Sequence, residues 1–408
     1  MPEVPFLPSP VHLPGANIRV VGVGGAGCNA IERMIQSGVG GVQFISMNTD
    51  QQSLAQSGAH VKLPLGPLSM RGLGAGGNAE RGAVAAEESR EDILASLQGA
   101  DMVFITAGMG GGTGTGAGPV VASCAREIGA LAVAVVLTPF SWEGPAKAMK
   151  AEQGLENLRG TADTVIVVSN EKLAAHCERR ISMKEAFQVA DSVLIQGVRG
   201  IADLILRPGQ VNCDFADVEA VLRNGQEALI GTGQGRGEEA LLDALQRALN
   251  CPLLERAARG PASQVIVSAM ADWGQVEFSA VGTAMRYLQD HFAGNAEVKL
   301  GQVDAPELED RVLVTVLASG FLGERTPLCI DMPSSLSLEA APVPTPHVNT
   351  GPVYGEVPAA VGPSAEMPVA TPTRLLPQGP TPSTELDAAD DLHVPAIIRM
   401  SQGRLPIE

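Results

Sequence analysis

Aromatic residues make up only 3% of this 408-residue chain, and none of its six cysteines forms a C-x-x-C pair. The cysteines stand far apart, as do the six histidines, which favours reduced structural thiols over a disulfide framework or a metal cluster. With so few aromatic residues, the core must be built from Val, Ile, Leu and Ala. That composition is common in parallel α/β sheets.

Positive charge and long apolar segments are also scarce. The formal net charge is −17, of which the last 78 residues carry −6, so −11 remains on the rest of the chain. Nucleic-acid binding is thereby disfavoured. No window reaches about 18 uninterrupted apolar residues, and residues 1–15 lack the basic and apolar regions of a signal peptide. We therefore expect a chain that is neither exported nor inserted into a membrane.

Glycine, in contrast, is concentrated in short loops. Residues 109–118 hold six glycines in ten positions, directly after the apolar run Met102 to Ala107. A plain turn needs one or two glycines, whereas this many let backbone N–H groups converge on an anion. The following helical pattern, with Pro119 expected in its first turn, makes phosphate the expected ligand. No lysine of a Walker loop is present, so dipoles and a metal ion must offset the phosphate charge.

A second glycine loop opens the chain and admits another interpretation. Gly22, Gly24 and Gly27 fit G-x-G-x-x-G, and Asp50 follows a second apolar run, Val42 to Met47, where a dinucleotide fold places its ribose-binding acid. Taken alone, this motif predicts a nicotinamide-dependent dehydrogenase. Two glycine loops on one site suit a nucleoside triphosphate better.

The alternation of apolar runs and helical patterns between residues 17 and 170 predicts a parallel, doubly wound sheet. A long amphipathic helix is expected from Met183 to Arg207, stopped by Pro208-Gly209. A third glycine run, residues 231–237, lacks a preceding strand and is interpreted as a flexible loop. Beyond the long helix, helices are expected over Ala216 to Arg223 and Glu238 to Asn250, and strands, partly antiparallel, near Gln264 to Met270, Val276 to Gly282, Glu297 to Val303 and Arg311 to Ser319.

Two acidic residues and the end of the chain each leave two interpretations open. Asp214 and Asp217 could polarise an attacking water, or they could simply cap the helix that starts near residue 217. Between Pro333 and Pro382 lie 12 of the 29 prolines, so no packed core can form there. The acid-flanked apolar stretch Asp390 to Arg399 that follows is either a docking peptide or a frayed terminus.

The run Gly110-Gly-Gly-Thr-Gly-Thr-Gly116 resembles the phosphate loop of the tubulin and FtsZ family. The resemblance covers about residues 17–322 and points to FtsZ, the bacterial tubulin-like cell-division GTPase, rather than to eukaryotic tubulin. Further segments resemble FtsZ in the family's order: Asn48-Thr-Asp50, Gly72-Leu-Gly-Ala-Gly-Gly-Asn78, Pro139-Phe-Ser-Trp-Glu-Gly144, Asn170-Glu-Lys-Leu173 and Asn212-Cys-Asp-Phe-Ala-Asp217.

The resemblance implies an α/β fold in which a Rossmann-like, parallel-sheet GTPase domain is joined by a long central helix to a smaller α/β domain, with a disordered C-terminal tail. The expected parts are an N-terminal extension (1–16), a GTP-binding domain (17–182), the central helix (183–208), a polymerisation and activation domain (209–322), a proline-rich linker (323–385) and a docking peptide (386–408).

The resemblance also assigns roles to residues, with GTP or GDP and Mg²⁺ as ligands and no protein ligands specified for the metal. Asp214 and Asp217 would act in hydrolysis. Two departures from the family stand out: Lys147 replaces an arginine, which puts its phosphate contact in doubt, and Ala79 replaces a proline. The nucleotide would be bound by Gly24, Gly25, Ala26, Gly27, Cys28 and Asn29, by Gly111, Gly112, Thr113, Gly114, Thr115 and Gly116, and by Glu143, Lys147, Asn170, Phe187 and Asp191.

In the family the nucleotide lies at the start of the central helix, and the acids follow its far end, about 37 Å away. They could reach a nucleotide only if subunits stack head to tail, and such a contact makes filaments. The resemblance therefore implies a GTPase that polymerises into the cytoplasmic division ring at mid-cell. It also implies membrane-tethering division proteins that bind Asp390 to Arg399, where Ile397-Ile398 stands in place of the usual Phe-Leu. The alternative is a nucleotide-bound scaffold polymer with little hydrolysis.

Overall fold

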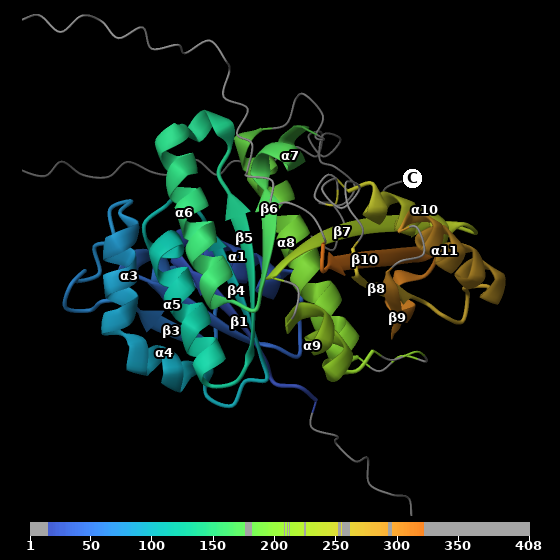
Figure 1. Cartoon of the computed structure of the whole chain (residues 1–408), viewed down its shortest axis with the longest axis horizontal. Helices are drawn as coiled ribbons and strands as arrows, with labels where there is room; N and C mark the ends of the chain where they lie inside the picture. The colour runs from blue at the N-terminus through green and yellow to red at the C-terminus, as the bar shows by residue number, and fades with distance from the viewer. Residues whose placement is uncertain are drawn as a thin grey trace, which may run out of the picture. The chain divides into compact units, whose positions relative to one another are not determined.

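The computed structural model describes residues 15–175, 182–207, 209, 211, 213–223, 226–251, 254, 262–292 and 296–321. Its centre is one sheet of ten strands in the order β3-β2-β1-β4-β5-β6-β7-β10-β8-β9, with helices packed on its faces (Figure 1). The expected linker and docking peptide, and residues 1–14 of the N-terminal extension, lie outside the described residues.

The first part of the sheet is parallel, as the alternation of apolar runs and helical patterns predicts. Strands β1 to β7 all pair in parallel, and helices return the chain between most of them. The elements are β1 (Ile18–Val23), α1 (Gly24–Gln36), β2 (Gln43–Asn48), α2 (Gln51–Gln56), β3 (Val61–Pro64), α3 (Ala79–Glu88), α4 (Arg90–Leu97), β4 (Met102–Gly108), α5 (Thr113–Glu127), β5 (Leu131–Thr138), η1 (Ser141–Glu143), α6 (Pro145–Thr161), β6 (Thr164–Ser169) and α7 (Asn170–Ala175).

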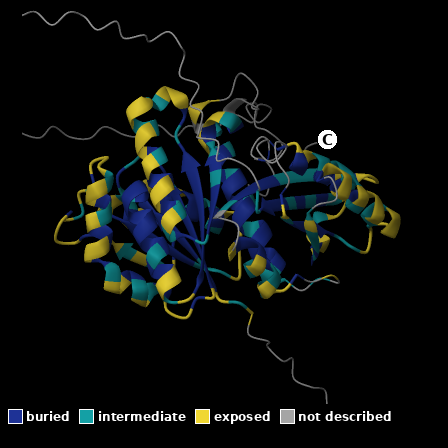
Figure 2. Ribbon diagram, viewed as in Figure 1, coloured by how far each residue is buried: buried dark blue, intermediate teal, exposed yellow. Residues whose placement is uncertain are grey.

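Both faces of this parallel part are covered. Successive side chains of a strand point to opposite faces, so Val20 and Phe104 belong to one buried cluster and Val21 and Ile105 to another. Helices α1 and α8 pack on the first face and α3 to α6 on the second. The inner strands are accordingly mostly buried, whereas the edge strand β3 alternates between half-buried and exposed residues, and the helices expose their outer sides (Figure 2). Small aliphatic side chains fill both layers, as the shortage of aromatics requires.

The long amphipathic helix is present as α8 (Met183–Leu206). A capping box starts it: the Ser182 hydroxyl accepts a bond from the Glu185 amide at 3.2 Å, and the Glu185 carboxylate accepts one from the Ser182 amide at 2.6 Å. Its buried side chains, among them Leu194 and Val198, share one cluster with residues from the parallel and the antiparallel part of the sheet, including Val133 and Ile266. The helix therefore packs against both parts of the sheet.

The second part of the chain contains α9 (Phe215–Arg223), β7 (Gln226–Arg236), α10 (Ala240–Leu249), β8 (Gln264–Ala271), α11 (Phe278–His291), β9 (Glu297–Asp304), η3 (Pro306–Leu308) and β10 (Arg311–Ser319). Strand β10 lies between β7 and β8 and is antiparallel to both, whereas β9 is parallel to β8. The two helices and three of the four strands expected here are confirmed.

The third glycine run is not a loop, and that prediction was wrong. It forms most of β7, where Gly231, Gly233 and Gly235 alternate on the face against α10. A Cβ at these three positions would lie 2.1, 2.0 and 1.9 Å from backbone oxygens of α10. The glycines thus let a helix backbone pack directly on a strand, a use of glycine that differs from its use in turns.

Two further predictions need correction. Residues Val276 to Gly282 belong mainly to α11 rather than to a strand, because Val281, Ala284 and Leu288 follow helical spacing onto the core. Helix α5 begins at Thr113, inside the glycine-rich segment, so that Pro119 lies within the helix and not in its first turn.

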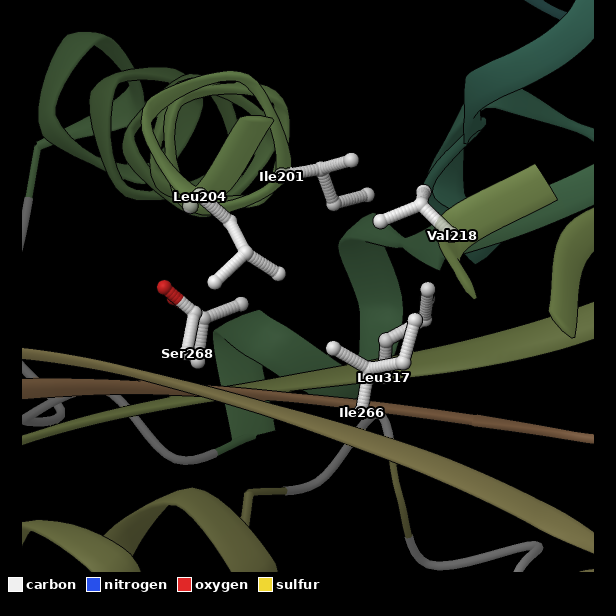
Figure 3. Close-up of a pocket in the computed structure, with 8 residues that line it drawn as sticks. Ile201, Leu204, Val218, Ile266, Ser268 and Leu317 are labelled. Carbon is white, nitrogen blue, oxygen red and sulfur yellow. The ribbon is translucent and has the colours of Figure 1, made fainter. Parts of the chain in front are cut away.

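A small, mostly apolar cavity lies between α8 and the antiparallel strands. Figure 3 shows Ile201 and Leu204 of α8 facing Ile266 and Ser268 of β8, with Val218 of α9 at one side. Gly200 of the same helix approaches closely, since a Cβ there would lie 2.5 Å from the Thr315 hydroxyl. Apart from the hydroxyls of Ser268 and Thr315, the lining offers little for a polar ligand to bind.

Candidate functional site

Two glycine-rich helix N-termini meet at the carboxyl edge of the parallel strands. Helix α1 begins at Gly24, directly after β1, and α5 begins at Thr113, shortly after the adjacent strand β4. Gly24 has a φ of +72°, and a Cβ there would lie 2.9 Å from the Gly114 amide nitrogen. The two loops therefore touch, and two sets of unpaired helix N–H groups share one edge. Such an edge attracts anions.

The glycines of these loops serve two different purposes. A Cβ on Gly116 would lie 1.9 Å from the Ala79 carbonyl oxygen, and one on Gly27 would lie 2.4 Å from the Thr106 carbonyl oxygen, so close packing requires these glycines. At Gly25 and Gly111, in contrast, no described atom outside the local backbone lies within 4 Å of a Cβ. Packing does not account for these two glycines. They leave the backbone accessible to a ligand.

The loop of residues 72–78 closes one side of this edge. A Cβ on Gly112 would lie 3.0 Å from the Asn78 amide, and the hydroxyls of Thr49 and Thr113 are 2.6 Å apart. Lys150 reaches across from α6 to the Gly77 carbonyl at 2.8 Å. Three glycine-rich segments and the start of α6 thus surround the anion-attracting edge.

Glu143 and Lys147 lie beside this edge but bond to one another. The Lys147 ammonium pairs with the Glu143 carboxylate, whose Oε1 also accepts a bond from the Phe140 amide at 2.8 Å. The main chain of Lys147 lies against Gly110, where a Cβ would be 2.6 Å from the Lys147 carbonyl oxygen. In this arrangement the lysine orients the glutamate, and its charge is partly neutralised.

Asn170 is one of four residues, among those the structure describes, with a buried side-chain atom that lacks a hydrogen-bond partner. It follows β6 and opens α7, is 5% exposed, and its side-chain oxygen has no hydrogen-bond partner. Leaving such an atom unpaired costs roughly 1–3 kcal/mol. A ligand that donates to this oxygen would remove the cost.

Phe187 and Asp191 project from the first turns of α8 toward the same region. The Phe187 ring meets the Phe140 ring edge to face, with centroids 5.4 Å apart. Asp191 is buried, and its Oδ2 accepts a bond from the Arg33 guanidinium of α1. Burial raises the pKa of the Asp191 carboxyl to about 6, and the positive charge of Arg33 offsets only part of that rise.

Sequence reasoning missed Arg33. Its position could have been found from helix spacing, because Gly25, Asn29 and Arg33 are four residues apart and lie on one face of α1. Cys28 lies on another face: it is 3% exposed, and burial raises the pKa of its thiol to about 11. Cys28 can therefore offer a ligand no thiolate, and as the fifth residue of α1 it has its backbone amide paired within the helix.

Asp214 and Asp217 lie away from these groups, beyond the opposite end of α8. Asp214 caps α9: its Oδ1 accepts a bond from the Asp217 amide at 2.8 Å, while Asp217 Oδ2 lies 3.4 Å from the Asp214 amide. The capping interpretation is thus confirmed. The cap lies beside the last turns of α8, where Val218 of α9 lines the same cavity as Ile201 and Leu204. The helical segment from Asp191 to Leu204 spans about 20 Å. Within one chain the two groups cannot meet.

The geometry agrees with the sequence relatives. Residues 17–178 match the Tubulin/FtsZ family, GTPase domain, and residues 226–322 match the FtsZ family, C-terminal domain. The chain is 42% identical to FtsZ from M. jannaschii in an empty dimer, with a TM-score of 0.70 over 75% of this chain and 88% of that one. The chain belongs to the FtsZ family. The nicotinamide-dependent dehydrogenase interpretation is therefore discarded.

Other solved structures share the fold. An engineered variant of the M. jannaschii FtsZ is 41% identical, with a TM-score of 0.71 over 75% of this chain and 92% of that one. The CetZ2 protein of Haloferax volcanii, solved as a GTPγS-bound protofilament, is 23% identical, with a TM-score of 0.64 over 76% of this chain and 94% of that one. A GTPase domain and the FtsZ fold are thus established for this chain.

Neither a metal cluster nor a membrane-spanning helix is found in the described part of the chain. No three His, Cys, Asp or Glu side chains there are grouped to hold a metal ion. None of the described helices is both long and apolar enough to cross a membrane.

Proposed function

We propose that this chain is a GTPase that assembles head to tail, and that the GTP bound by one subunit is hydrolysed with acids of the next. The observation that carries the proposal is the separation of two sites along α8. Glycine-rich helix N-termini lie toward one end of this 24-residue helix, which is about 36 Å long, and a paired-carboxylate cap lies beside its other end. Stacking in one direction brings the acids of each subunit to the nucleotide of its neighbour. This heterologous contact extends into a filament.

The nucleotide-binding roles follow from the groups around the edge. Residues 24–29 and 111–116 surround the phosphates, which accept bonds from those backbone amides of the first helical turns that are not paired within α1 and α5, and Gly25 and Gly111 are open to the ligand. Glu143, oriented by Lys147, accepts the ribose hydroxyls. For the base, Phe187 provides a stacking face and Asp191 accepts donors of guanine. The unpaired Asn170 oxygen is placed to accept another donor.

The reaction needs no covalent intermediate. The oxygen of a water molecule forms a bond to the γ-phosphorus, and the bond from that phosphorus to the β–γ bridging oxygen breaks, leaving its electron pair on GDP. One proton of the water passes to a carboxylate of the neighbouring subunit, and inorganic phosphate is released. Since the described residues offer no metal cluster, Mg²⁺ would be held by the phosphates and water, where it offsets their charge.

Family membership supports a proposal for the cellular role. We propose filaments that form the cytoplasmic ring at the division site, attached through membrane-tethering proteins that bind Asp390 to Arg399. No basic surface for nucleic acid is expected at a net charge of −17. A scaffold polymer that binds nucleotide but scarcely hydrolyses it remains the competing function, because the Asp214 cap is also a complete structural feature.

Phosphate release and light scattering, recorded together against protein concentration, test the function. A site shared between subunits requires turnover per chain to rise from near zero above a threshold concentration, and scattering must appear at the same threshold. ATP and NAD serve as nucleotide controls. Scattering without phosphate release would favour the scaffold, and concentration-independent turnover would show a self-contained site.

Guanine binding should weaken in mild acid because of Asp191. The ionised carboxylate accepts hydrogen bonds from the two guanine donors. A protonated carboxyl is a weaker acceptor, and it must lose its proton before both of its oxygens can accept. Burial raises the pKa of Asp191 to about 6, so affinity should be full above that pH and fall as the pH drops through it. At pH 5 we expect about a tenfold loss of affinity for GDP, the fraction of carboxylate that remains.

Equilibrium titration of GDP between pH 5 and 8, below the assembly threshold, measures this dependence. The Asp191→Asn variant provides the control, since its amide does not titrate and its affinity, though lower, should be flat across this range. If the affinity of Asp191→Asn for GDP still fell in acid as it does in the original protein, another group would be responsible for the pH dependence.

A further inference from the structure

A lysine contacts the acids at the far end of α8, and neither motif nor spacing pointed to it. Lys299 of β9 places its ammonium 2.5 Å from Asp217 Oδ1. The other oxygen of the same carboxylate faces the Asp214 amide at 3.4 Å. Both oxygens of Asp217 are therefore engaged, and its side chain is held in one orientation.

Asp214 has a different environment although it stands only three residues away. It is exposed, and the bond recorded for its carboxylate uses Oδ1, which accepts from the Asp217 amide. Lys299 pairs with Asp217 and, at 3.7 Å, with Glu297. The ammonium is thus committed to two other carboxylates, and Asp214 is the acid whose charge the lysine does not directly neutralise.

The asymmetry has a chemical consequence, because paired carboxylates divide their tasks when their environments differ. The bond from Lys299 lowers the pKa of Asp217, which keeps that carboxylate ionised and makes it a poor proton acceptor. Two uncompensated carboxylates would also repel the triphosphate of the neighbouring subunit. An ammonium beside one of them reduces that repulsion without blocking the other.

We propose that Lys299 is a positioning residue for GTP hydrolysis: it holds and neutralises Asp217, so that Asp214 is the carboxylate that takes the proton of the attacking water on the neighbouring subunit. This inference rests on the proposed function, since it concerns acids that act on another subunit's nucleotide. It adds a residue and divides the roles of the two acids. The lysine acts through Asp217 and does not need to touch the nucleotide.

The test compares Lys299→Met, which keeps the stem and removes the charge, with Lys299→Arg, which keeps the charge. Phosphate release per assembled subunit should fall about tenfold in Lys299→Met, which is less than the loss expected on removing an acid–base group itself, because the lysine acts through Asp217. In Lys299→Arg it should return to within about twofold of the original rate. The affinity of the unassembled chain for GDP should be unchanged in both. Lys62→Met, on the exposed face of the edge strand β3, makes the same change in net charge and should have no effect.

Structural damage and failure of the function are separated by further measurements. The thermal unfolding midpoint should move little in Lys299→Met, because the pair is partly exposed. If Lys299→Met turns over normally while Asp214→Asn does not, the inference is wrong and the function stands. If Asp214→Asn and Asp217→Asn both turn over normally, the shared-site function itself fails. Failure of arginine to restore turnover would show that charge is not what Lys299 supplies.

Discussion

Replacing Gly25 with valine should abolish nucleotide binding and leave the fold intact. Gly25 lies in the first turn of α1 with a negative φ, and a Cβ there meets no described atom within 4 Å apart from the local backbone. The valine side chain would therefore occupy the space above the helix N-terminus where phosphate is expected. Losing two charge-assisted hydrogen bonds costs about 3 kcal/mol or more, which corresponds to a loss of affinity for GDP of at least about 100-fold.

Equilibrium binding of GDP, with the thermal unfolding midpoint of the empty protein, checks this result. Gly160→Val is the matched control: Gly160 is an exposed glycine of α6 whose added Cβ would also meet nothing. Both variants should shift the free energy of unfolding by less than about 1 kcal/mol. Gly116→Val would be uninformative, because its Cβ would lie 1.9 Å from Ala79 O. Normal GDP affinity in Gly25→Val would exclude α1 from the phosphate site.

Periodicity predicted the parallel sheet and the long helix because each pattern was repeated over many residues. Prediction from periodicity failed for glycine, because glycine occurs both in loops and where two backbone segments pack closely. The alternating glycines Gly231, Gly233 and Gly235 indicated a loop, yet they admit the backbone of α10 onto a strand, and the sequence carries no sign of which helix packs there. The short run from Val276 to Gly282 is compatible with the periodicity of a strand and with that of a helix. The burial of Leu288, farther along the chain, indicates a helix.

The candidate site was predictable as far as it follows local order along the chain. The loops at Gly24 and Gly111 are consecutive glycines, and the cap at Asp214 and Asp217 is a three-residue spacing. Arg33 and Lys299 could not be found in this way. Each is a single basic residue whose partner is 158 and 82 residues distant, and only the packing of α1 on α8, and of β9 beside α9, brings the charges together.

Removing the charge of Asp214 should nearly stop hydrolysis and leave binding and folding unchanged. Asp214→Asn is the informative substitution, because asparagine caps a helix as well as aspartate does and can still accept the bond from the Asp217 amide. Its amide cannot take a proton from water. Phosphate release per assembled subunit should fall about 10²- to 10³-fold, with GDP affinity and the unfolding midpoint unaltered. Turnover near the original rate would support the scaffold function instead.

Mixing the two inactive variants distinguishes a shared site from a self-contained one. Asp214→Asn subunits bind GTP but lack the acid, and Gly25→Val subunits have the acid but bind no GTP. In a head-to-tail filament, one contact in about four of an equal, random mixture joins a bound GTP to an intact acid, so turnover should reappear at up to about a quarter of the original. If each chain used its own acid, no contact in the mixture could be active. The recovered rate therefore reports directly on whether the 24-residue helix α8 separates two halves of a site that only assembly completes.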